Sequence, residues 1–349
     1  MDIKEEPHKR RIRYKGTHPK TFETKYKELQ PNKYADTITK VIQKGNTPAG
    51  MHRPICVNEI LEVLNITSGE RGLDATLGFG GHSLEILKSL NHTGHLYATD
   101  VDPLELPRTK ERLNSLGYGA DLLTVIQTNF VDIDIIVLES GPLNFILADL
   151  GVSSMQIDNP KRGFTFKQNG PLDLRMNPNS GIPASELLTS MTKNQLEEMF
   201  VENADEPHAE IIAANIVAEL YKGNAIATTT ELRNIIKKAL NFLPKNERNE
   251  EIKKTCQRCF QALRIEVNNE LGILFEFLEK IPDCLAPGGR VAILSFHSGE
   301  DRLVKKAFQH YYRTGVFREV ARTPILPSIE ECNTNSRARS AKLRWAIKA

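Results

Sequence analysis

Apolar residues recur along the chain with two different spacings, and these spacings predict its elements. Val57, Ile60, Leu61 and Leu64 recur every three or four positions, which is typical of an amphipathic helix. Beyond them, short apolar runs that predict strands alternate with segments of helical spacing. The predicted strands are 71–76, 95–100, 122–127, 143–150, 290–296 and 341–347, and the predicted helices among them include 83–90 and 103–116. This alternation indicates an α/β protein with a parallel sheet covered by helices.

The alternation stops after Asp149 and resumes only after Pro287-Gly288-Gly289. The polar loops and helical segments between them are too long for an ordinary connection and need a fold of their own. We therefore interpret residues 160–255 as an inserted, mainly helical domain for substrate recognition. Residues 51–159 and 256–349 would form the sheet domain, and residues 1–50 a basic N-terminal extension with weak helical periodicity over 26–44.

The net charge of +2 conceals a strong asymmetry along the chain. Residues 1–45 carry +6 and residues 302–349 carry +8, which leaves −12 for the residues between them. Basic ends on an acidic body indicate arms that grip a polyanion such as RNA, although solvated basic tails are the simpler alternative. No apolar run approaches the length of a membrane span, and the charged start lacks the apolar core of a signal peptide. We therefore expect a cytoplasmic protein without membrane contact.

The five cysteines are scattered and odd in number, which argues against the disulfide framework of a secreted protein. Cys256 and Cys259 have the spacing of a zinc-binding pair, but the sequence offers no second Cys/His pair at such a spacing. We expect reduced thiols and no metal.

A glycine-rich turn, Asp74-x3-Gly78-x-Gly80-Gly81, joins a predicted strand to a predicted helix. Backbone N–H groups at such a helix start can hold a charged or polar ligand. The spacing differs from the G-x-G-x-x-G of dinucleotide binders, because Ser83 stands where the third glycine would be. Asp100 ends the next strand, where an acid suits the ribose hydroxyls of an adenosine cofactor. The alternatives are an ordinary tight turn and a helix cap.

Seven further segments, in this order, resemble the RsmH/MraW family of methyltransferases. They are His82-Ser83, Asp149-Leu150-Gly151-Val152-Ser153-Ser154-x-Gln156, Arg162-Gly163-Phe164-x-Phe166, Gly170-Pro171-Leu172-Asp173-x-Arg175-Met176, Phe260-Gln261-Ala262-x-Arg264-Ile265-x-Val267-Asn268, Ser295-Phe296-His297-Ser298-x-Glu300-Asp301-Arg302 and Arg337-Ala338-Arg339-Ser340. The chain departs from the family pattern at Ala75, Cys259, Gly299 and 203–210, which bears on target choice.

The resemblance implies a class I fold, that is, a Rossmann-like sheet with an inserted helical domain, and S-adenosylmethionine (SAM) as cofactor. It implies an rRNA-processing enzyme that methylates N4 of a cytidine in the decoding region of 16S rRNA, in the small ribosomal subunit or an assembly intermediate. It leaves open whether the chain forms a homodimer. The alternatives are a SAM-dependent methyltransferase of another RNA, DNA or protein target, and a non-catalytic ribosome assembly factor. The glycine spacing disfavours a nicotinamide dehydrogenase.

The resemblance also implies which residues form the site. Those expected to contact SAM are Gly80, Gly81, His82, Asp100, Phe130, Asp149 and Gln156. Asp149 is also the candidate catalytic group, because an acceptor near the conjugated amine would take its proton after transfer. Those expected to contact RNA are Arg162, Arg175, Arg264, Asn268, His297, Arg337 and Arg339. A core position for Phe130, a structural role for His297 and pairing of the arginines with the acidic body are the alternatives.

Overall fold

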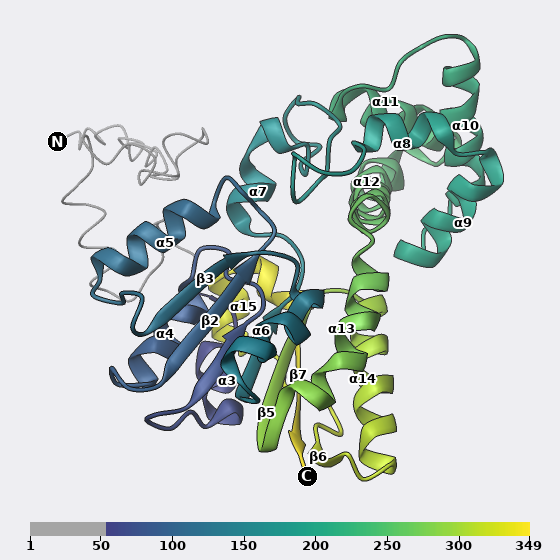
Figure 1. The fold of residues 1–349 in the computed structure, drawn as a ribbon. Coiled ribbons are helices and arrows are strands. Elements are labelled where there is room, and N and C mark those ends of the chain that lie inside the picture. The colour runs from purple at the N-terminus through teal and green to yellow at the C-terminus, as the bar shows by residue number, and fades with distance from the viewer. Residues whose placement is uncertain (1–53) are drawn as a thin grey trace, which may run out of the picture.

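The computed structural model describes residues 54–349, and a seven-stranded sheet forms its centre (Figure 1). The strands in chain order are β1 (Arg71–Asp74), β2 (His95–Asp100), β3 (Leu123–Gln127), β4 (Leu143–Asp149), β5 (Leu285–Ser295), β6 (Phe317–Val320) and β7 (Lys342–Lys348). They lie in the order β3-β2-β1-β4-β5-β7-β6. Neighbours among β1 to β5 are parallel, whereas β7 runs antiparallel to β5 and β6 antiparallel to β7. This confirms the predicted Rossmann-like α/β fold. The extension of residues 1–50 lies outside the described residues.

Helices cover both faces of the sheet because its central strands are apolar on both sides. Along β4, Phe145 and Leu147 point to one face and Ile146 and Ala148 to the other, and all four are fully buried. The first face packs against α3 (Val57–Leu64), α4 (Gly81–Ser89) and α5 (Leu106–Ser115). The second packs against α6 (Ile133–Ser140), α13 (Glu270–Cys284) and α14 (Ser298–Arg313). The packing on both faces holds the carboxyl ends of β1 to β4 together at one edge of the sheet. The candidate functional site lies at this edge.

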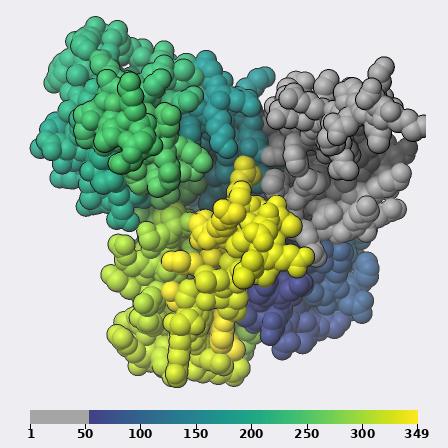
Figure 2. Space-filling view, turned by 180° about the vertical axis from the view of Figure 1, so that it is seen from behind, coloured from purple at the N-terminus to yellow at the C-terminus, as the bar shows by residue number. Residues whose placement is uncertain are grey.

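A separate hydrophobic core lies in the helical part between β4 and β5. Its helices are α8 (Ala184–Ser190), α9 (Lys193–Ala204), α10 (Ala209–Tyr221), α11 (Thr229–Ala239) and α12 (Lys245–Asn268). Capping boxes begin α9 at Thr192 and α11 at Thr228, so the sequence fixes where these helices start. Figure 2 shows this part in teal and green as a lobe beside the yellow C-terminal residues. The lobe lies at the edge of the sheet where the parallel strands have their carboxyl ends (Figure 1).

Two short segments link the site to these larger parts. The helix α7 (Ser154–Asp158) and the 3-10 turn η3 (Pro160–Arg162) follow β4. Near the C-terminus, α15 (Ile329–Thr334) is followed by the 3-10 turn η5 (Ser336–Ser340). Further 3-10 turns are η2 (Phe130–Asp132) and η4 (Leu240–Phe242). None of the helices in residues 54–349 has the length and apolarity needed to cross a membrane.

The structure differs from the sequence-based expectations at several boundaries. The strand expected from Arg290 already begins at Leu285, which pairs with Leu143 before an irregularity interrupts the ladder. The edge strand β6 and the helix α6 were not expected. The expected domain boundary at residue 255 falls within α12, which continues unbroken to Asn268 and contributes Leu263 to the helical core.

Candidate functional site

A cavity of about 1020 Å³ lies at the carboxyl ends of the parallel strands, between the sheet and the helical part. In open α/β sheets ligands bind at this edge. Six of the seven residues expected to contact SAM line it, namely Gly81, His82, Asp100, Phe130, Asp149 and Gln156. Its opposite wall comes from α12, the start of α13 and the segments around η3 and η5. The structure therefore gathers the expected cofactor residues on the sheet side of one cavity.

Gly80 is not in the cavity wall, and it shapes the wall through the conformation of the turn. It adopts φ +64°, a left-handed conformation that favours glycine, and caps the start of α4. A Cβ atom at this position would lie 2.9 Å from Thr109 Cγ2 and 3.1 Å from Leu113 Cδ1. Glycine thus lets the turn pack closely on α5 while the first residues of α4 face the cavity.

Two acids hold the glycine turn against the strand ends. Asp74 is buried and accepts hydrogen bonds from Ser83 Oγ at 2.5 Å and from the Thr76 N–H at 3.1 Å. Asp100 accepts from the Gly78 N–H at 2.7 Å through Oδ2 and from the Asp102 N–H at 2.8 Å through Oδ1. Burial raises the pKa of Asp100 to about 6, although these two N–H groups oppose the shift. Its carboxylate retains acceptor capacity toward the cavity, which suits ribose hydroxyls.

His82 and Asp149 form a pair beside this turn. His82 Nε2 lies 3.5 Å from Asp149 Oδ2. Burial alone would lower the pKa of His82, but the adjacent Asp149 carboxylate outweighs this effect, so the pKa is raised. Among the described residues, His82 Nε2 and Asp149 Oδ1 are buried atoms without a hydrogen-bond partner. Buried polar atoms normally have partners, so this wall fits a ligand that supplies polar groups, as SAM does through its amino and carboxylate groups.

Phe130 and Gln156 line the cavity while also serving the protein interior. Phe130 packs edge-on against Phe277, with ring centroids 4.9 Å apart, so it combines the core position that was the alternative with a place in the cavity wall. Gln156 is buried and completes a capping box with Ser153 at the start of α7. Its Nε2 donates to Asp102 Oδ2 at 2.8 Å. The amide of Gln156 is thus held in place by the protein before any ligand binds.

Arg162, which was expected to contact RNA, is buried in an ion pair within the protein. Its side chain is 7% exposed, and Nη1 donates to the buried Asp102 Oδ2 at 2.7 Å. Nη2 donates to the carbonyl oxygens of Arg175 at 3.1 Å and Met176 at 2.7 Å. The guanidinium therefore ties the segment after α7 to the end of β2. Sequence reasoning missed Asp102 as the partner; its only signal was a second acid two residues after Asp100.

The other expected RNA residues are divided between the cavity and the surface. Arg264, Asn268 and Arg337 line the cavity. Arg339 in η5 is exposed. Arg175 lies outside the cavity wall and makes a two-point contact with Asp173, with Nε and Nη2 each 2.8 Å from a carboxylate oxygen.

Asn268 and Arg337 each join segments that are far apart in the sequence. Asn268 accepts from the Met176 N–H at 2.7 Å and donates to the Leu174 carbonyl oxygen at 2.8 Å, which anchors that segment on α12. Arg337 Nη2 donates to Asp158 Oδ1 at 3.0 Å, which joins η5 to the end of α7 at the cavity. Its Nη1 is buried without a hydrogen-bond partner among the described residues.

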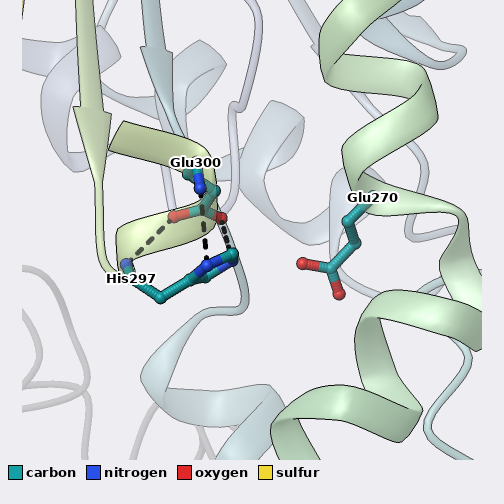
Figure 3. Close-up of side chains that lie close together, drawn as sticks. All are labelled: Glu270, His297 and Glu300. Carbon is teal, nitrogen blue, oxygen red and sulfur yellow. Dashed lines mark hydrogen bonds and ion pairs between the residues drawn. The ribbon is translucent and has the colours of Figure 1, made fainter. Parts of the chain in front are cut away.

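His297 belongs to a cluster with Glu270 and Glu300 whose ligand atoms lie within 4.8 Å of one another (Figure 3). His297 caps α14, since its Nδ1 accepts from the Glu300 N–H at 3.4 Å. In the neutral ring Nε2 then carries the hydrogen and cannot coordinate a metal. Both oxygens of Glu270 accept from Arg264. We therefore assign no metal to the cluster, and His297 takes the structural role that was the alternative.

Glu300 is held in its ionised form within this cluster. Burial would raise its pKa, but the neighbouring His297 ring and the charge of Arg264 lower it overall. Its Oε2 also accepts from the Phe296 N–H at 2.7 Å. Glu300 thus adds a charged group to the cavity wall at the start of α14.

Buried thiols near the cavity are poor metal ligands in this protein. Burial raises the pKa of Cys256 to about 12 and raises the pKa of Cys259 well above its ordinary value. Both cysteines lie in the core side of α12. The five cysteines are all free thiols, as expected from the sequence.

Comparison with known proteins agrees with this geometry. The model of the MraW methylase family matches residues 49–349. "Ribosomal RNA small subunit methyltransferase H 2" of Alkaliphilus metalliredigens is 68% identical over all of both chains. "Ribosomal RNA small subunit methyltransferase H 1" of Lachnoclostridium phytofermentans is 63% identical over 98% of this chain and 93% of its own. The protein of the same name from Agathobacter rectalis is 56% identical over 99% of each chain.

Proposed function

Because the chain belongs to the MraW methylase family of SAM-dependent methyltransferases, we propose that it methylates N4 of a cytidine in the decoding region of 16S rRNA. Its relatives are named as methyltransferases of small-subunit rRNA, which supports this class of target. The observation that carries the proposal concerns Asp149 Oδ1 at the end of a central strand. This oxygen is buried without a hydrogen-bond partner in residues 54–349, and Asp149 lines the same cavity as the expected cofactor residues. The substrate would be the small ribosomal subunit or an assembly intermediate, in the cytoplasm.

The expected cofactor residues would contact different parts of SAM. Asp100 would accept from the ribose hydroxyls, and Phe130 would lie against the adenine. The start of α4 at Gly81 and the ring of His82 offer donors for the carboxylate of the methionine part. When bound, SAM supplies an electrophilic methyl group on its sulfonium.

The work left to the protein is alignment of the target amine and removal of its proton. The lone pair of the cytosine amine is conjugated with the ring, so the nitrogen is a weak nucleophile. Asp149 Oδ1, as acceptor, would favour a more pyramidal nitrogen and would take the proton once the new N–C bond has formed and the methyl group has left sulfur. Oδ2 stays directed at His82, 3.5 Å away. A raised histidine pKa would favour a positively charged ring beside this carboxylate.

The helical part and the basic residues around the cavity would recognise the RNA. We propose the division into residues 51–159 with 256–349 for catalysis and 160–255 for recognition, with α12 shared by both. Reaching the amine within structured rRNA requires that the cytidine be unstacked, which costs a few kcal/mol. Arg339 is exposed within η5, whose residues Arg337 and Ser340 line the cavity, and it would contact phosphate.

The proposal is tested by incubating the protein with radiolabelled SAM and undermethylated small subunits, followed by nucleoside analysis of the rRNA. Label in N4-methylcytidine is the expected result. Label in another nucleoside would retain the methyltransferase and reject the target. SAM binding without transfer to any assembly state would favour a protein substrate or an assembly factor.

The role of Asp149 is tested separately by single-turnover transfer with Asp149→Asn. Loss of the charged acceptor should slow transfer by about 100-fold or more, the usual share of one general base, while SAM binding is retained. Asp283→Asn in α13, an exposed acid outside the cavity wall, serves as the control. An unchanged rate in Asp149→Asn would rule out this role.

A further inference from the structure

Arg264 extends from α12 into the cavity wall opposite the sheet, and Glu270 fixes the plane of its guanidinium. Nε donates to Glu270 Oε1 at 2.7 Å and Nη2 donates to Oε2 at 2.9 Å. The two side chains are 16% and 9% exposed. A two-point contact of this kind leaves a guanidinium little freedom to turn. Glu270 thereby determines where the remaining nitrogen, Nη1, points.

Nη1 lies beside the loop that follows β4. A Cβ atom built on Gly151 would be 4.0 Å from it, and Gly151 is two residues after Asp149. Within residues 54–349, Nη1 donates to no other group, and both Arg264 and Asp149 line the cavity. One cavity therefore holds a charged N–H donor beside the loop that begins after Asp149, together with Asp149 Oδ1, a carboxylate oxygen that has no partner among the described residues.

The strand order places this pair on the side where the target must enter. Of the expected adenosine contacts, Asp100 ends β2 and Phe130 follows β3, and both strands lie on one side of β1. β4 and β5 lie on the other side, and Asp149 pairs with Leu294 of β5. Glu270, which holds Arg264, lies with its ligand atom within 4.8 Å of those of His297 and Glu300, and these two residues follow β5. A base that approaches a methyl group near Asp149 from this side would meet Arg264.

The Watson–Crick edge of cytosine presents an amine donor at N4 and acceptors at N3 and O2. We propose that Arg264 Nη1 donates to N3 of the target cytosine while Asp149 Oδ1 accepts from N4, so that Arg264 determines base specificity and Glu270 positions it. Uracil presents the reverse pattern, an acceptor at position 4 and a donor at N3, so both contacts would become repulsive. This inference rests on the proposed function and names the residue that selects its base.

The proposal also predicts which kinetic step Arg264 affects. While the amine lone pair is conjugated, it enriches N3 with electrons. That density is lost as the lone pair forms the bond to the methyl carbon. The hydrogen bond from Nη1 is therefore stronger in the bound substrate than in the transition state, so its loss should raise KM and should leave kcat unchanged or raise it.

The test uses small subunits reconstituted with 3-deazacytidine at the target position, in which a C–H group replaces the N3 acceptor. Wild-type protein should lose about 10- to 100-fold in kcat/KM on this substrate relative to cytidine, the effect of one hydrogen bond from a charged donor. In Arg264→Gln the ratio of kcat/KM between the two substrates should shift by that factor, to the value set by the intrinsic reactivities of the two bases. Comparing ratios removes the intrinsic difference in reactivity between the two bases.

Two further variants guard against misfolding and misassignment. Glu270→Gln retains the Arg264 donor but weakens the contact that holds it. The ratio of kcat/KM on cytidine to kcat/KM on 3-deazacytidine should therefore fall between the wild-type value and that of Arg264→Gln. Arg258→Gln on the same helix breaks ion pairs with Glu206 and Glu251 and lies outside the cavity wall, so the ratio should stay as in wild type. SAM binding checks that each variant is folded.

Undiminished discrimination against 3-deazacytidine in folded Arg264→Gln and Glu270→Gln would overturn the assignment of Arg264. Failure of the proposed function looks different, because wild-type protein would then form no N4-methylcytidine on unmodified subunits. If Arg264→Gln does not fold, discrimination in Glu270→Gln equal to that of wild type would suffice to reject the proposal.

Discussion

Replacement of Arg162 by methionine should destabilise the fold, because Arg162 neutralises a carboxylate that water does not reach. Asp102 is 1% exposed and Arg162 is 7% exposed, and their contact is 2.7 Å. Methionine fills similar space but cannot pair with Asp102 or donate to the carbonyl oxygens of Arg175 and Met176. The substitution thus leaves one buried charge without its counter-ion and two carbonyl groups without their donor.

Breaking a buried pair by removing one partner costs about 3–5 kcal/mol. Asp102 keeps two other donors, the Gln156 amide and the Leu104 N–H, both within hydrogen-bond distance. These contacts partly solvate the remaining charge, so the lower end of the range, about 3 kcal/mol, is expected. Asp102→Asn combined with Arg162→Met removes the charge as well and should recover part of the loss.

Urea unfolding, followed by circular dichroism with and without SAM, measures this change. Lys161→Met, an exposed neighbour in η3, is the matched control and should change stability by less than about 0.5 kcal/mol. A loss below about 1 kcal/mol in Arg162→Met, together with weaker RNA binding by the folded protein, would refute the structural role and restore the RNA contact inferred from the sequence.

Three further predictions concern the cofactor wall. Because burial raises the pKa of Asp100 to about 6, its carboxylate is lost below that value, so SAM affinity by calorimetry should fall as pH drops through about 6 and stay flat in Asp100→Asn. Asp149 raises the pKa of His82 above 6.5 against the opposing effect of burial, so the pair stabilises the fold below about pH 6.5 and loses this effect as pH rises through the folded-state pKa. The difference in free energy of unfolding between wild type and His82→Gln, measured in urea, should therefore narrow with rising pH. A difference that stays constant with pH would contradict this. Gly80→Ala should cost at least about 1 kcal/mol and lower SAM affinity, whereas Gly117→Ala, with φ +93° and nothing within 4 Å of the added Cβ atom, should show the backbone cost alone.

The sequence pattern predicted those structural features that depend on residues close together in the sequence. The strand expected at 95–100 is β2 as observed, because its apolar run is bounded by polar turns on both sides. Asp100 and Asp149 end their strands, so their place at the cavity follows from the parallel arrangement alone. Features that depend on distant partners were not predictable in this way.

Two examples show why distance matters. β6 has four residues, of which only Phe317 is buried, and it exists because β7 pairs with it. Arg162 has the sequence appearance of a surface cation, and only the fold brings Asp102, sixty residues earlier, against it. A buried ion pair of this kind leaves no periodic signal, since each partner is a single charge in a polar segment.

The pairing of β4 with β5 sets an order for how the chain folds. These strands are neighbours in the sheet, yet Asp149 pairs with Leu294, so the whole helical part must be enclosed before the ladder can close. Closing a flexible loop costs more as it lengthens, by about 0.6 kcal/mol for each doubling. The helices α8 to α12 pack on one another and can form their core from local contacts first. We expect them to shorten the effective loop, so that β5, and β7 after it, join the sheet last and complete the cavity wall only then.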